Sequence, residues 1–91
     1  MPLSNEQQHH FVGRVGVEAW QHIGTRMKEL EPIRPTERII AELGAVAVCL
    51  ANILRPAIEA SNSRSSAAEQ LLQRVVQEAR TLLEPVIREQ P

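Results

Sequence analysis

The chain has 91 residues, a net charge of −1 at pH 7 and a composition that is 43% hydrophobic but only 2% aromatic. A chain of this length forms one domain, residues 1–91, and its balanced charge argues against a nucleic-acid-binding protein, which needs clustered Lys or Arg. The abundant Glu, Gln, Arg, Ala and Leu favour helices, and aromatic residues typical of strands are nearly absent. The composition therefore predicts an all-α fold.

The first predicted helix covers about residues 5–30 and begins at Ser4, which forms a capping box with Gln7. Trp20 lies on the edge of its apolar stripe, and we expect it to be buried against the third helix or a partner chain. The helix also contains three glycines, each costing ~1 kcal/mol relative to Ala: Gly13, Gly16 and Gly24. Either these glycines let another backbone come close, or the helix is loose or breaks at Gly24.

The second predicted helix covers about residues 37–60. Two prolines in residues 31–35 end the first helix, and Thr36 is a favourable N-cap for the second. Leu43–Leu54 contains no charged residue, which predicts a buried central helix and is too short for a bilayer span of ~20 residues. Pro56 predicts a kink or a helix end, because proline lacks an N–H and clashes with the preceding turn.

The third predicted helix covers about residues 67–89. It follows the serine-rich loop 61–66 and begins with a second capping box, from Ser66 to Glu69. Its apolar residues fill one face and its Gln, Arg and Glu residues the other. Three helices joined by short connections predict an antiparallel three-helix bundle. We expect this bundle to self-associate, because a small chain buries only a shallow core.

The second helix has two different faces. Its large-residue face consists of Ile39, Ile40, Leu43, Val46, Leu50, Ile53, Leu54, Ala57 and Ile58. The opposite, small-residue face consists of Ala41, Ala45, Val48 and Asn52, with Arg38 and Arg55 at its ends. This face suits close helix contact. Three alternatives remain: one of the chain's own helices covers it, the glycine-bearing first helix being one candidate, a second copy or another protein covers it, or water tolerates it. We predict the second, a two-fold homodimer at this face.

Few residues suggest chemistry. Glu18 and His22 share a helix face, but a solvated pair explains this spacing better than a metal site, which needs more ligands. Cys49 is the only cysteine, and its apolar neighbours predict a buried, unreactive thiol. The sequence contains no glycine-rich phosphate loop, and without Asp it has no Ser–His–Asp triad. We therefore expect no catalytic, cofactor-binding, metal-binding or small-molecule site.

These features predict a cytoplasmic helical module that binds itself and another protein, as an adaptor, inhibitor or subunit, and that is not an enzyme. The N-terminal residues lack the apolar segment of a signal peptide, and we expect no membrane association. The alternative is a small nucleic-acid-binding transcriptional regulator that uses Arg34, Arg38 and Arg55. The absence of a basic cluster makes nucleic acid the less favoured partner.

Overall fold

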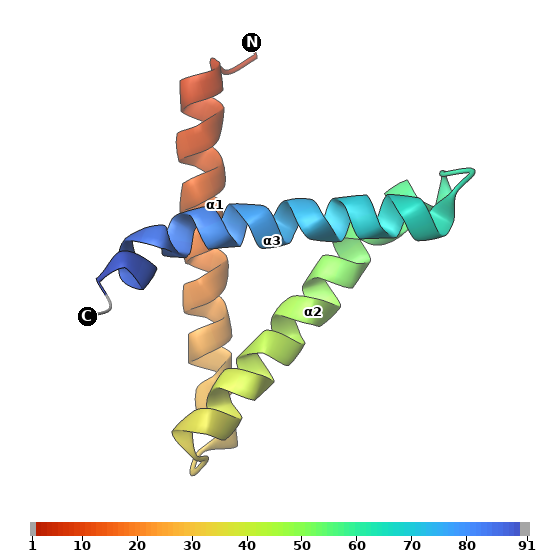
Figure 1. Ribbon diagram of the computed structural model, residues 1–91. Coiled ribbons are helices and arrows are strands. Elements are labelled where there is room, and N and C mark those ends of the chain that lie inside the picture. The colour runs from red at the N-terminus through yellow and green to blue at the C-terminus, as the bar shows by residue number, and fades with distance from the viewer. Residues whose placement is uncertain (1, 90–91) are drawn as a thin grey trace. The chain divides into compact units, whose positions relative to one another are not determined.

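The computed structural model describes residues 2–89. Figure 1 shows its three helices, α1 (Asn5–Met27), α2 (Pro35–Glu59) and α3 (Arg64–Arg88), and a 3₁₀ turn, η1 (Lys28–Leu30), directly follows α1. No strand occurs within this part of the chain. The predicted all-α class with three helices is therefore confirmed and is consistent with a three-helix bundle. Self-association stays a prediction.

The chain divides into two compact units, Met1–Val48 and Cys49–Pro91. The first unit contains α1, η1 and the N-terminal half of α2, and the second contains the remainder of α2 together with α3. The boundary between the units lies inside α2. Each unit is thus a pair of helical segments joined by a short connection.

The predicted capping box at the start of α1 is confirmed. The Ser4 N–H donates to Oε1 of Gln7 at 2.9 Å, and the Gln7 N–H donates to Oγ of Ser4 at 3.1 Å. Two backbone donors that the first turn leaves unpaired are thereby satisfied. From this start the helix continues through Gly24 to Met27, so the alternative of a break at Gly24 is wrong.

The start of α2 differs from the prediction, because Thr36 is not the residue that precedes the helix. Pro35 is the first helical residue, and the Arg38 N–H donates to the Arg34 carbonyl at 2.9 Å. Proline is well suited to this position, since the N–H that it lacks has no helical partner there. At the other end α2 continues through Pro56 to Glu59, so the helix does not end at Pro56.

The start of α3 also differs, and the predicted capping box at Ser66 is wrong. The helix begins at Arg64 rather than 67, and Ser63 occupies the cap position without a side-chain hydrogen bond to the first turn. The Ala67 N–H donates to the Ser63 carbonyl at 2.9 Å. This bond places Ser66 inside the first turn, where its side chain no longer precedes the helix.

No residue between 2 and 89 is buried. The half-buried residues lie mostly beside the two connections. In the first unit they are Ile23, Gly24, Met27, Ile33, Arg38, Ala41, Glu42 and Ala45. In the second unit, apart from Glu84, they are Leu50, Leu54, Ile58, Ser61, Ala67, Ala68 and Leu71. Trp20 is 66% exposed, so its expected burial against the third helix is wrong, and its burial against a partner chain stays a prediction.

The two helix starts can be tested with one pair of substitutions. Ser4→Ala removes the capping-box bond from the Gln7 N–H to the Ser4 hydroxyl, and we expect it to lower the free energy of unfolding by ~1 kcal/mol. Ser66→Ala should cause no loss, because Ala is the better helix former inside a helix. Urea titrations followed by circular dichroism measure both effects. An equal loss for the two variants would mean that α3 begins at residue 67 after all.

Candidate interaction surface

The two ends of the predicted small-residue face differ in their exposure to solvent. Among its residues, Arg38, Ala41 and Ala45 are half-buried in the first unit, whereas Val48, Asn52 and Arg55 are exposed. The predicted interface is therefore not one uniformly open surface within the single chain. The reason lies in the partners of Arg38.

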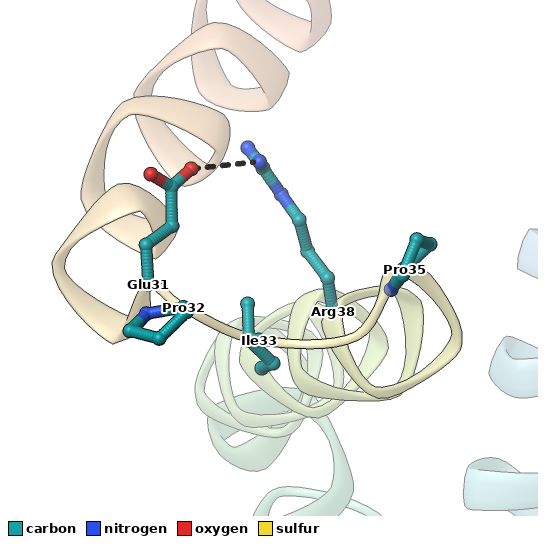
Figure 2. Close-up of a pocket in the computed structure, with 5 residues that line it drawn as sticks. All are labelled: Glu31, Pro32, Ile33, Pro35 and Arg38. Atoms are coloured by element: carbon teal, nitrogen blue, oxygen red, sulfur yellow. Dashed lines mark ion pairs between the residues drawn. The ribbon is translucent and has the colours of Figure 1, made fainter.

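Arg38 connects α2 to the C-terminal end of α1. Its Nη2 donates to the Gly24 carbonyl at 3.1 Å, and its Nη1 lies 3.6 Å from Oε1 of Glu31 (Figure 2). The 3₁₀ turn after α1 directs the Lys28 N–H to the carbonyls of Thr25 and Arg26 instead of to Gly24. Arg38 thus supplies a donor for a carbonyl near the end of the helix, where positive charge also suits the helix dipole.

Ala41 and Ala45 are three and seven residues after Arg38, so all three side chains lie on one face of α2. Arg38 holds the start of α2 close to Gly24 of α1. Which of our three alternatives holds for the small-residue face as a whole stays open. No glycine is needed for this approach, since a Cβ at Gly13, Gly16, Gly24 or Gly44 would meet nothing within 4 Å.

The connection between α1 and α2 forms an open depression of about 560 Å³. Figure 2 shows the residues that line it, which are Glu31, Pro32, Ile33, Pro35 and Arg38. Its two charged side chains face each other across the depression and form the ion pair described above. The remaining lining is proline and isoleucine.

Large apolar side chains are exposed on all three helices, and those of α2 and α3 form two defined faces. We define the α2 apolar face as Ile39, Ile40, Leu43 and Val46, and the α3 apolar face as Leu72, Val75, Val76, Leu82, Leu83 and Val86. All ten side chains are exposed, with Leu82 reaching 80%. Exposed apolar patches of this kind mark interaction sites. The sequence predicted that Leu43–Leu54 is the buried central helix of one chain, and this prediction is wrong, because none of its residues is buried.

Three residues with possible chemistry lie on the surface. Cys49 is exposed, so the expected burial of its thiol is wrong: its apolar neighbours in the sequence do not enclose it. Glu18 and His22 are likewise exposed. Among residues 2–89, no three His, Cys, Asp or Glu side chains come together as a group that could hold a metal ion.

The length and composition of α2 are those of a possible membrane span, with a mean hydropathy of 1.6 over its most apolar window. Charged residues limit this possibility. Glu42 and Arg55 bracket Leu43–Leu54, whose twelve residues extend only ~18 Å. The hydrocarbon core of a bilayer is ~30 Å thick, so at least one of these charges would enter it.

Comparisons of this chain with protein-family models, with curated proteins and with solved structures find no match. Its function is therefore inferred from the chain's own surfaces.

We expect Arg38→Ala to lower the free energy of unfolding by ~1 kcal/mol, because it removes a hydrogen bond and an ion pair from a side chain that is only 32% exposed. Glu31→Gln should have a smaller effect, since the bond to Gly24 remains. Arg34→Ala is the control, with the same change of charge at an exposed position nearby. Urea unfolding measures all three variants. Equal losses for Arg34→Ala and Arg38→Ala would contradict a specific role for Arg38.

We expect the Cys49 thiol to react stoichiometrically with Ellman's reagent in the native protein, because it is exposed. The rate should lie within about tenfold of the rate in urea, since little opening of the structure is needed. The measurement is the absorbance time course with and without denaturant. Protection that disappears only on unfolding would show that a partner or the fold covers this side of α2.

Proposed function

We propose that this protein is a non-enzymatic, cytoplasmic interaction module. A second copy of the chain covers the exposed apolar faces of its helices in a two-fold dimer. In a cell such a dimer would serve as an adaptor, an inhibitor or a subunit for another protein. A single observation carries the proposal: a chain that is 43% hydrophobic has no buried residue between positions 2 and 89.

Isolated helices of the size found here need tertiary packing. The three helices have 23, 25 and 25 residues, and in proteins most of the stability of a helix comes from packing of its amphipathic face rather than from helix propensity. Their ion pairs, such as Arg74–Glu78 at 3.4 Å, are exposed and local, so each contributes only tenths of a kcal/mol. Burial of apolar surface is the largest favourable contribution to folding. A stable helical state therefore requires something to cover the apolar faces.

A second copy suits this requirement better than the alternatives. Most soluble oligomers are symmetric homo-oligomers, and a chain with a net charge of −1 repels its own copy only weakly. Nucleic acid would require basic residues, yet Arg38 is already paired with Glu31 and the Gly24 carbonyl. A membrane would have to accept Glu42 or Arg55 in its hydrocarbon core.

The test is a concentration series from about 1 to about 100 μM. Sedimentation equilibrium should give the mass of a dimer at the upper end, and the midpoint of thermal unfolding should rise with concentration, because dilution favours the dissociated state. Flotation with phosphatidylcholine and phosphatidylglycerol vesicles is the control for membrane binding. A monomer with a concentration-independent midpoint, or a chain that floats with the vesicles, would contradict the proposal.

A further inference from the structure

The end of α1 contains a backbone carbonyl with two possible donors. In a regular α-helix the Lys28 N–H would donate to the Gly24 carbonyl, four residues earlier. Here the Lys28 N–H is directed to the carbonyls of Thr25 and Arg26. Nη2 of Arg38 donates to the Gly24 carbonyl instead, at 3.1 Å. The Arg38 side chain and the Lys28 backbone therefore compete for one acceptor.

Arg38 is connected to both ends of the turn η1. The Gly24 carbonyl lies before the turn, and Gly24 and Arg38 are both half-buried. Glu31 directly follows the turn, and its Oε1 lies 3.6 Å from Nη1 of Arg38, which keeps the guanidinium group beside η1 (Figure 2). All these residues belong to the first unit, so the competition does not depend on the position of α3.

The residues of the turn favour an α-helix by themselves. Lys28, Glu29 and Leu30 are all helix formers, whereas the hydrogen bonds of a 3₁₀-helix have poorer geometry. The Arg26–Glu29 ion pair, at 2.7 Å, suits either form, because residues three apart are also neighbours on an α-helix. Pro32 disfavours the α conformation only in the residue directly before it. The 3₁₀ form of η1 therefore needs a cause outside the turn.

We propose that the hydrogen bond from Arg38 to Gly24 is a conformational device that holds the end of α1 in the 3₁₀ form. When the guanidinium group leaves, the Lys28 N–H takes the Gly24 carbonyl and α1 continues as an α-helix to Leu30. Arg38 is a positioning residue, since it acts through the acceptor that it occupies. This inference is independent of the proposed dimer, because every contact in it lies within one chain.

The exchange changes the direction in which the chain leaves α1. A 3₁₀-helix turns by about 120° per residue and an α-helix by about 100°, so the two forms of a three-residue turn differ by about 60°. α2 begins at Pro35, soon after the end of η1 at Leu30. Its start therefore takes a different angle to α1 in each form. Arg38, itself a residue of α2, thus sets the angle at which its own helix meets α1 in the first unit.

The test uses NMR couplings across hydrogen bonds, which identify the acceptor of each amide in the isotope-labelled full chain. Arg38→Met removes the guanidinium donors and keeps an unbranched apolar side chain, which preserves the packing of the arginine stem. The wild-type protein should show coupling from the Lys28 amide to the Thr25 carbonyl. In Arg38→Met we expect the coupling to move to the Gly24 carbonyl.

Two substitutions serve as controls. Arg34→Met makes the same change at an exposed position of the same connection and should leave Lys28 coupled to Thr25. Glu31→Gln removes the ion pair but keeps the bond from Arg38 to Gly24, so it should leave the turn unchanged. Movement of the coupling to Gly24 in either control would show that the charge of the connection, rather than the Arg38 bond, selects the turn, and would overturn the proposal.

The remaining outcomes also decide. A wild-type coupling from Lys28 to Gly24, or its absence in Arg38→Met, overturns the proposed competition. Residual dipolar couplings of residues 5–27 and 35–48 measure the angle between α1 and the first half of α2. A change of tens of degrees in Arg38→Met is expected, and an unchanged angle overturns the role of Arg38 in setting it. A monomer by sedimentation would contradict the proposed function and leave these outcomes unaffected.

Discussion

Burial of apolar side chains is the interaction on which these helices depend, because local interactions alone supply little. The capping box at Ser4, the ion pairs along α3 and the Arg38 connection each act over a few residues. They decide where a helix begins and how two helices meet at a connection. None of them covers the apolar stripes, which carry most of the free energy available to the chain.

Arg38 shows how a residue with a plausible role in binding serves the chain's own structure instead. Its guanidinium group satisfies a carbonyl that the 3₁₀ turn leaves without its usual donor. An arginine at the edge of a small-residue face looks from the sequence like part of an interface. Only the geometry of the α1 end, where Lys28 bonds to Thr25 and Arg26, shows what this side chain contacts.

Helix identity could be predicted from this sequence because it depends on nearby residues. The Ser4 box and the ends of the three helices follow from periodicity and local chemistry, with errors of up to three residues at Thr36 and Ser66. Burial could not be predicted in the same way, because it depends on which surfaces meet. The runs around Trp20 and Cys49 are apolar in sequence, yet both residues are exposed in the single chain. The amphipathic pattern identifies a face to be covered and leaves open which chain covers it.

The boundary between the two units lies inside a continuous helix. An insertion or deletion in α2 at this boundary therefore changes the helical phase between the two halves of its apolar stripe. Each added residue turns everything beyond it by 100° about the helix axis. An insertion of one residue between Val48 and Cys49 would therefore put the stripe of Leu50, Leu54 and Ile58 out of phase with Ile39, Leu43 and Val46. A seven-residue insertion, close to two full turns, would nearly restore the phase. The apolar stripe thus permits α2 to change length in steps of whole turns and not one residue at a time.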